Sequence, residues 1–327
     1  MIVKPTVFVL GAGASVPYGF PTGPELADEV CRHFEDMAPP GHPFRDTEFS
    51  LALMGAFNDH GVSIPLIQQF APAFRLAGCD SLDEFVQPPG NRRFLNLVKA
   101  AIITTLLRRE EDGRLTDANK READWFRYLF KHLRTEDYGS FFANKVKVIT
   151  FNFDRSFERR LFLTLRAYYG IGDDEATRLR GVIPVLHLHG KLGGEEWLGE
   201  RRPESRAYTT AASTAQKLAL LDAIKIVHEE LDPRDIATAQ TWLREAQVIC
   251  FLGFGFHRLT LSRLGVDQKL PLATIFGTTK GLSGPELRRI KNDFGNRVDN
   301  SLRLDEGGDR DAFQYLKDVH VLFTDRG

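Results

Sequence analysis

Short apolar runs recur along the chain, and each is bounded by glycine, proline or polar residues. The first run reads TVFVL and ends at Gly11, a pattern typical of a buried parallel strand that leads into a tight turn. Similar runs lie at residues 146–151, 184–189, 248–253, 272–276 and 319–323. Because helical periodicity separates these runs, the sequence predicts an α/β fold with a doubly wound, mostly parallel, Rossmann-like sheet.

The stretch between the first two apolar runs is long and has helical periodicity, most clearly at residues 94–107 and 125–133. A long segment with its own periodicity is typical of an insertion that folds beside a sheet. We therefore interpret residues 35–143 as a large helical insertion. The sheet domain around it is predicted to comprise residues 1–34 and 144–327.

A second, smaller helical insertion is expected after the third apolar run, at about residues 191–246. Residues 217–230 and 233–246 have helical patterns within it. Asp232 precedes a proline at the start of the second pattern, which is the arrangement of an N-cap residue followed by proline at the first helical position.

The composition excludes several classes of protein. Hydrophobic residues make up 43% of the 327 residues and charged residues 27%, as in ordinary globular proteins. The 43 Lys and Arg residues nearly balance the 44 Asp and Glu residues, and the arginine pairs are dispersed. A groove that binds nucleic acid directly is therefore not expected.

The sequence also contains no apolar run near the roughly 20 residues of a membrane helix and no signal-peptide pattern, so we expect a cytoplasmic protein without membrane contact. Its three cysteines, Cys31, Cys79 and Cys250, are odd in number and far apart. Neither a disulfide framework nor a four-cysteine zinc site fits that spacing, and we expect no bound metal.

Small residues follow the first apolar run: Gly11, Ala12, Gly13, Ala14 and Ser15, with Gly19, Phe20 and Pro21 shortly after. Such a turn lets backbone N–H groups approach a pyrophosphate, and the helix that follows points its positive end at the charge. The third glycine of the G-x-G-x-x-G dinucleotide pattern would fall at Val16, which disfavours a dehydrogenase. A glycine-rich turn that serves packing alone is an equally open interpretation.

The second predicted strand ends in Thr150, Phe151, Asn152, Phe153 and Asp154. Ligands of open parallel sheets bind at the carboxyl ends of strands, so this Asn and this Asp are candidate site residues. Asp154 could instead cap the helix predicted to begin near Ser156. Capping does not explain Asn152, which lies two residues earlier on the same face.

The third and fourth motifs also end predicted strands. His187 and His189 share a face if the strand continues, so both imidazoles could enter one site, and a pair of zinc ligands must be considered. His189 precedes a glycine at the strand terminus, which suits an imidazole that acts as a base. The fourth strand is followed by Gly253 and Gly255, whose backbone could admit ribose or phosphate.

These motifs, GAGAS, GFP, TFNFD, HLHG and GFGF, resemble in their order the motifs of the sirtuin family, across about half of the chain. The resemblance implies an NAD-binding domain. It implies that Asn152 orders the reacting ribose or water, that Asp154 holds the nicotinamide amide and that His189 is the base. Other residues expected to line the cofactor site are Gly11, Ala12, Gly13, Ala14, Ser15, Gly19, Phe20, Pro21, Thr150, Gly253, Gly255 and Phe256.

The chain departs from the sirtuin pattern in three places. Phe151 replaces the glutamine of the strand end, Thr22-Gly23-Pro24 replaces the D-F-R segment, and the CxxC pairs of the zinc module are missing. The chain more closely resembles a bacterial branch that has helices in place of the zinc module and destroys NAD during phage infection. The segment SLDEF at residues 81–85 also resembles that branch.

We therefore expect an NAD+ glycohydrolase, with NAD as substrate and no zinc, that acts as the effector of an anti-phage defence system. It would be activated by assembly into a homo-oligomer or by a second defence protein, such as an ATPase or a sensor subunit. Two alternatives stay open: a module that senses NAD or ADP-ribose without turnover, and a sirtuin-type protein deacylase, which the missing zinc cysteines disfavour. The phenylalanines beside the motifs could shield the site, although each one alone is better explained as core.

Overall fold

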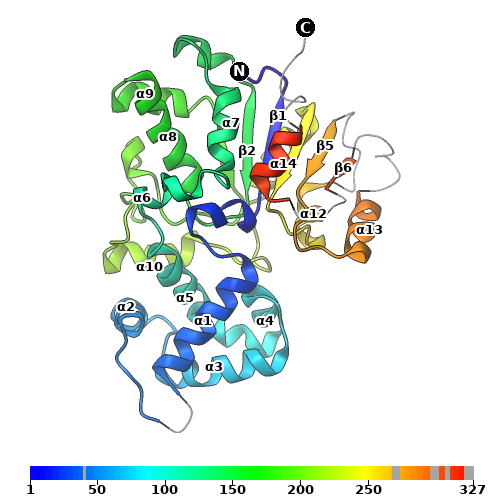
Figure 1. Cartoon of the computed structure of the whole chain (residues 1–327). Helices are drawn as coiled ribbons and strands as arrows, with labels where there is room; N and C mark the ends of the chain where they lie inside the picture. The colour runs from blue at the N-terminus through cyan, green and yellow to red at the C-terminus, as the bar shows by residue number, and fades with distance from the viewer. Residues whose placement is uncertain (40–41, 267–272, 295–301, 306–309, 320–327) are drawn as a thin grey trace.

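A parallel sheet with the strand order β3-β2-β1-β4-β5-β6 lies at the centre of the molecule (Figure 1). The computed structural model describes residues 1–39, 42–266, 273–294, 302–305 and 310–319. The described strands are β1 (Thr6–Leu10), β2 (Val146–Thr150), β3 (Val185–His187), β4 (Val248–Leu252), β5 (Thr274–Gly277) and β6 (Leu302–Leu304). This strand order is that of a doubly wound Rossmann fold, which confirms the predicted fold class.

Alternate residues of the buried strands enter two different cores, because neighbouring side chains of a strand point to opposite faces. Phe8 and Leu10 belong to one core, whereas Val7 and Val9 belong to the other. The first face is covered by α7 (Trp125–Leu133), α8 (Ser156–Tyr169) and α14 (Ala312–Val319). The second is covered by α11 (Pro233–Glu245), α12 (Arg258–Leu264) and α13 (Gly284–Asp293).

A group of helices from the first half of the chain lies beyond one end of the sheet, in the lower part of Figure 1. It consists of α1 (Gly23–Met37), α2 (Glu48–Phe57), α3 (Ile64–Ala77), α4 (Leu82–Val86) and α5 (Leu95–Leu107), and α10 (Thr214–Ala223) packs against α2 and α5. Phe34, Phe70 and Phe94 of this group share one continuous core with Phe8 and Leu10 of the sheet.

Shorter elements complete the fold within the described residues. The remaining α-helices are α6 (Asp112–Leu115) and α9 (Asp173–Arg180). The 3-10 helices are η1 (Ala12–Ala14), η2 (Val16–Tyr18), η3 (Pro89–Phe94), η4 (Ala118–Lys120), η5 (Gly139–Ala143) and η6 (Glu196–Leu198).

The predicted strands agree with the observed ones up to β5, with no boundary more than two residues away where the positions are described. Leu272, at the start of the fifth predicted run, and residues 320–323 of the sixth lie outside the described residues. Val319, the first residue of the sixth run, ends α14, so a strand beginning there is wrong. The sixth strand of the sheet is Leu302–Leu304, which has too short an apolar pattern to be recognised.

The helix predicted at residues 217–230 is wrong in its second half, because α10 ends at Ala223. Two backbone amides beyond that point donate to distant segments of the chain. Lys225 N donates to the His189 carbonyl at 2.7 Å, and Val227 N donates to Asp83 Oδ1 at 2.8 Å. Periodicity along the chain cannot reveal such long-range partners. Helix α11 and its N-cap Asp232 are confirmed.

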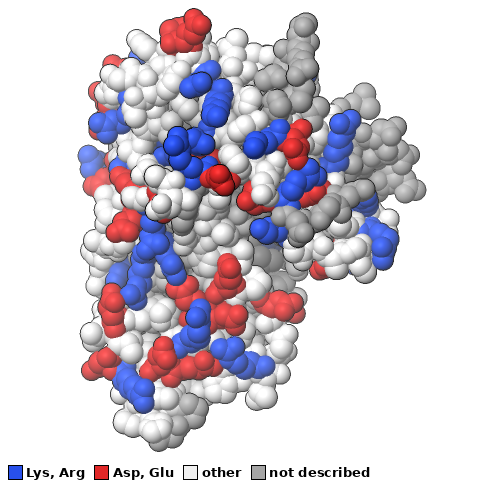
Figure 2. All heavy atoms as spheres, in the orientation of Figure 1, with Lys and Arg blue, Asp and Glu red and all other residues white. Residues whose placement is uncertain are grey.

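Within the described residues, no helix combines the length and the apolar character needed to cross a membrane. Basic and acidic side chains intermingle on the face of the molecule drawn in Figure 2. That face therefore presents no continuous basic surface.

The turns after β1 and β4 lie backbone against backbone. Gly11 N donates to the Leu252 carbonyl, and Gly13 N donates to the Gly253 carbonyl, both at 3.0 Å. Gly253 has a φ of +56°, and a Cβ atom placed on it would lie only 2.1 Å from the Ala14 nitrogen. These glycines are therefore required by packing, which is the second of the two interpretations of the glycine-rich turn.

We predict that Gly253→Ala lowers the free energy of unfolding by about 3 kcal/mol, because the added methyl meets backbone atoms and the residue keeps a left-handed φ. Gly255→Ala is the matched control, since a Cβ there meets no atom within 4 Å. It should change stability by less than about 0.5 kcal/mol. Denaturant unfolding of both variants tests this, and equal stabilities would contradict it.

Candidate functional site

A cleft of about 220 Å³ lies at the carboxyl ends of the strands. It is at the point where the strand order runs from β1 to β2 and β3 on one side, and to β4, β5 and β6 on the other. This switch point is the usual ligand-binding position of doubly wound sheets. The cleft brings together ten of the predicted site residues from four turns: Gly11, Ala12, Ser15, Phe20, Pro21, Asn152, Asp154, His189, Gly255 and Phe256.

Five other predicted site residues do not line the cleft and have supporting contacts instead. Gly13 and Gly253 pack against each other, and the Ala14 carbonyl accepts from Trp125 Nε1 at 2.7 Å. Thr150 Oγ1 accepts a hydrogen bond from the backbone N–H of Asn152 at 3.1 Å. Gly19 ends η2 with a left-handed backbone conformation. These residues shape the turns that carry the cleft residues.

Most backbone N–H groups of the turn after β1 donate hydrogen bonds to carbonyl groups of the protein itself. Besides Gly11 N and Gly13 N, Ala14 N donates to the Gly11 carbonyl and Ser15 N to the Ala12 carbonyl. Within the described part of the chain, the Ala12 amide is the one in this turn without a protein partner. The expected cradle of several free amides for a diphosphate is therefore reduced to one.

The helix expected directly after this turn is also absent, because two short 3-10 helices, η1 and η2, follow it. The long helix α1 begins only at Gly23, after its N-cap Thr22. Thr22 and Gly23 nevertheless line the cleft, so the positive end of α1 faces it from across the turn.

Asn152 is held in one orientation by two hydrogen bonds. Its Nδ2 donates to the Gly11 carbonyl at 2.9 Å and to Ser15 Oγ at 3.0 Å. A carbonyl only accepts, so the amide cannot be flipped without losing that bond. Asn152 lines the cleft, and within the described residues no protein group donates to its side-chain oxygen.

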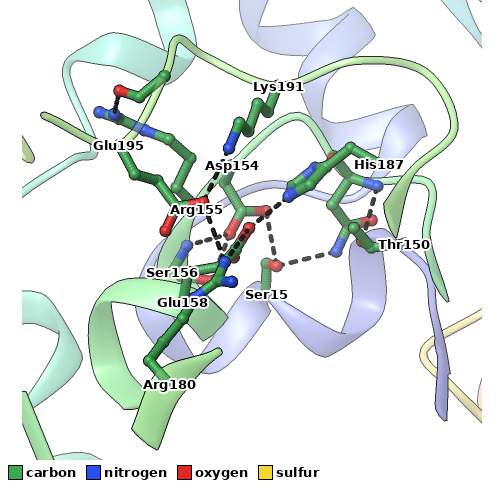
Figure 3. Close-up of polar contacts among 12 residues, drawn as sticks. Ser15, Thr150, Asp154, Arg155, Ser156, Glu158, Arg180, His187, Lys191 and Glu195 are labelled. Carbon is green, nitrogen blue, oxygen red and sulfur yellow. Dashed lines mark hydrogen bonds and ion pairs between the residues drawn. The ribbon is translucent and has the colours of Figure 1, made fainter. Parts of the chain in front are cut away.

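Asp154 is a buried anchor of this arrangement (Figure 3). Its Oδ2 accepts from Ser15 Oγ at 2.7 Å, and its Oδ1 accepts from the backbone amide of Ser156 at 3.0 Å and from the Ser156 hydroxyl. Burial raises the pKa of Asp154, although the hydrogen bonds from the two serines oppose that shift. Both carboxylate oxygens are thus engaged, and Oδ1 accepts from the first amide of α8, whose N-cap residue is Arg155.

His187 points away from the cleft, so the expectation that both histidines enter one site is wrong. Strand β3 ends at His187, and the alternation that would align it with His189 ends there too. Its Nδ1 lies 2.9 Å from the Asn152 carbonyl oxygen, and its Nε2 lies 2.5 Å from Glu158 Oε1 (Figure 3). His187 thus supports the backbone of Asn152 from behind.

Glu158 is buried in a network of charges under this strand end. Burial by itself raises the pKa of Glu158, but His187, then Arg180 and Lys191, lower it to about 2. The Glu158 carboxylate is therefore ionised, and His187 Nε2 lies directly beside it. The same network continues to Glu195 (Figure 3). Its Oε1 atom lies 3.0 Å from Arg180 Nη2 and 2.8 Å from Lys191 Nζ.

His189 lies in the cleft wall and is only 4% exposed. Its ring makes an edge contact with Phe151, with a centroid distance of 5.4 Å. Burial, and to a smaller extent the positive charge of Arg263, lower the pKa of His189 to about 4. The imidazole is thus neutral at physiological pH, as a general base must be before it takes a proton.

Residues from outside the four motifs complete the cleft. They come from the start of α1, from the helical segment, from the loop after α10 and from the start of α12: Thr22, Gly23, Leu26, Asp83, Leu106, Val227, His257 and Thr260. Asp83 is partly buried, accepts one hydrogen bond from Val227 N, and has a pKa raised by burial. The SLDEF segment was the one sequence signal for it.

The charge of the cleft is unusual for a phosphate-binding site. Its described lining includes two carboxylates, Asp83 and Asp154, and no Lys or Arg. Phe256, also in the lining, has a φ of +50°, a conformation that costs energy for a side chain of this size. Such strain is common where a loop is shaped for a ligand.

A larger cavity of about 470 Å³ lies at the opposite ends of β1 and β2, between Lys145, Pro184 and Trp242. It contains none of the motif residues, and its charged lining residues Lys147 and Glu245 pair with each other at 2.9 Å. We therefore place the functional site in the smaller cleft. Among the described residues, no group of three or more His, Cys, Asp or Glu side chains is arranged to hold a metal ion.

Comparison with family models and with curated proteins finds no match for this chain.

We predict that His187→Ala lowers the free energy of unfolding by about 3 kcal/mol, because it removes the ring that contacts the buried Glu158 carboxylate. Arg180 then remains 3.9 Å from that carboxylate. His60→Ala, at an exposed position, should change stability by less than about 0.5 kcal/mol. Denaturant unfolding measures both, and a His187 variant as stable as the His60 variant would refute the assignment.

Proposed function

We propose that this chain is an NAD+ glycohydrolase, which cleaves the bond between nicotinamide and ribose in the cleft at the switch point of the sheet. The observation that carries the proposal is the fixed orientation of Asn152. Its amide group donates to Gly11 and Ser15, so its oxygen is available to accept a hydrogen bond from a water or a ribose hydroxyl in the cleft that His189 also lines.

In the proposed reaction, the bond between the ribose C1′ carbon and the nicotinamide nitrogen breaks, and the electron pair leaves with nicotinamide. A water oxygen then bonds to C1′. Asn152 positions that water or the neighbouring hydroxyl, and neutral His189 accepts the proton, which later passes to solvent. The carboxylates of Asp83 and Asp154 favour the positive charge that develops on the ribose, and the described lining contains no Lys or Arg to oppose it.

Binding of the diphosphate would rest on backbone groups. The Ala12 amide and the amino-terminal end of α1 at Gly23 face the cleft and supply partial positive charge. The volume of about 220 Å³ is below the 300–1,000 Å³ typical of pockets for drug-sized ligands. We therefore propose that the dinucleotide extends out of the enclosed part of the cleft.

The biological assignment rests on the resemblance to the zinc-lacking branch of sirtuin-like proteins. On that basis we propose an anti-phage effector, activated by self-assembly or by a second defence protein. Free NAD hydrolysis would deplete the cell's own cofactor, so activation must be controlled. Leu51 of α2 is 62% exposed and Leu76 of α3 is 89% exposed, and we propose these apolar side chains as contact positions in the assembly.

A sensor that binds NAD or ADP-ribose without turnover is the second candidate. It is favoured by one observation: Arg263 Nη1 lies 3.5 Å from His189 Nε2, on the side where a base must accept its proton. A hydrolase has to break this contact, whereas a sensor does not.

We predict that His189→Ala and Asn152→Ala each reduce nicotinamide release at least about 100-fold, because each removes a group that handles the proton or the water. Both variants should unfold within about 1 kcal/mol of the native chain. Asp154→Ala should lower turnover and stability together, since it removes the buried acceptor of Ser15 and Ser156. Retention of native turnover by either of the first two variants would show that the residue is not part of the reaction, and His60→Ala serves as the control.

The proposed activation by assembly predicts that turnover per subunit falls on dilution. Leu76→Asp should make the chain less active at high concentration, because a charge on an exposed apolar surface opposes association. Activity across a dilution series, together with light scattering, measures this. A monomer with full and concentration-independent activity would exclude activation by self-assembly.

A further inference from the structure

Arg263 is braced against the wall of the cleft at the last turn of α12. Its Nη2 donates to the Glu229 carbonyl at 3.0 Å, and its own carbonyl accepts from Gln240 Nε2 at 3.0 Å. These bonds aim Nη1 at His189 Nε2, 3.5 Å away. An arginine side chain only donates hydrogen bonds, so the lone pair of Nε2 faces Arg263 and the proton of the neutral ring lies on Nδ1.

The charge of Arg263 is not neutralised by a carboxylate beside it. The carboxylate of Glu229 is occupied by Lys99 Nζ at 3.1 Å and by the Ile226 amide at 2.9 Å. Within the described residues, Arg263 has no ion pair. Its field therefore acts on His189 with little compensation, and a like charge disfavours protonation of an imidazole.

Four other titratable groups lie on the elements around His189. Asp83, Asp154 and His257 line the same cleft, and His228 lies on the loop that includes Glu229. None of these four forms a hydrogen bond with His189 in the described structure. Burial and Arg263 are also the two causes that lower the pKa of His189, with burial the larger.

We propose that Arg263 is a positioning residue that holds the candidate base His189 in a resting state, because its guanidinium faces the lone pair that must accept the proton. Turnover then requires this contact to be broken. The inference rests on the proposed hydrolase function for its consequence in catalysis, whereas the contact itself can be tested without turnover.

The test compares Arg263→Gln, which removes the charge, with Arg263→Lys, which keeps it. Arg258→Gln is the matched control, since Arg258 is on the same helix and its side chain is 70% exposed. The titration of the His189 ring is followed by NMR. In the native chain its midpoint is expected near 4, and in Arg263→Gln it should rise by about one pH unit. Arg263→Lys and Arg258→Gln should stay close to the native value.

Nicotinamide release is measured on the same samples. Protonation of His189 removes the base, so activity is lost as the pH falls through the His189 midpoint, and this acidic limb should move upward with the NMR midpoint in Arg263→Gln. Turnover at neutral pH should rise several-fold, since a base with a higher pKa takes a proton more readily. Arg263→Met provides a second uncharged variant if Arg263→Gln unfolds.

An unchanged His189 midpoint in both uncharged variants would overturn the proposal, and so would a shifted midpoint with unchanged turnover in an active enzyme. A shifted midpoint in a chain that releases no nicotinamide, in any variant, would support the contact between Arg263 and His189 and count against the hydrolase. The two failures are thereby distinguished.

Discussion

The direct contact between the backbones of the turns after β1 and β4 is the constraint on which the site depends. Gly253 approaches Gly13 and Ala14 so closely that no side chain fits between them. This contact fixes the Gly11 carbonyl, which orients the Asn152 amide, and Asn152 in turn shares Ser15 with Asp154. The packing of the two turns is thus linked, through the Gly11 carbonyl, to the orientation of the Asn152 side chain, which lines the cleft.

Much of the fold could be predicted because it is recorded in local patterns. The buried strands β1, β2 and β4 are continuous apolar runs, and residues that end such strands must meet at one edge of a parallel sheet. Ten predicted residues accordingly line one cleft. The direction of His187 could not be predicted, because it depends on the residue at which β3 ends and on Glu158, which lies 29 positions earlier in the chain.

The remaining cleft residues are long-range features. Asp83 enters from α4 and is held by Val227, 144 positions later in the sequence, and Arg263 reaches His189 across 74 positions. No periodicity or spacing connects such pairs. The glycine-rich turn is a different case, since its sequence suits both packing and phosphate binding. Its internal hydrogen bonds favour packing for Gly13 and leave Ala12 as the residue available to a ligand.

The most direct test of the account is to incubate the native chain with NAD, to separate the products by chromatography, and to measure NAD binding by calorimetry at the same concentrations. The account predicts that NAD binds and that nicotinamide is released with an equal amount of ADP-ribose. Binding of NAD that stays intact, at all chain concentrations and with Arg263 replaced by Gln, would contradict hydrolysis and identify a sensor. Absence of binding would contradict the assignment of the cleft itself.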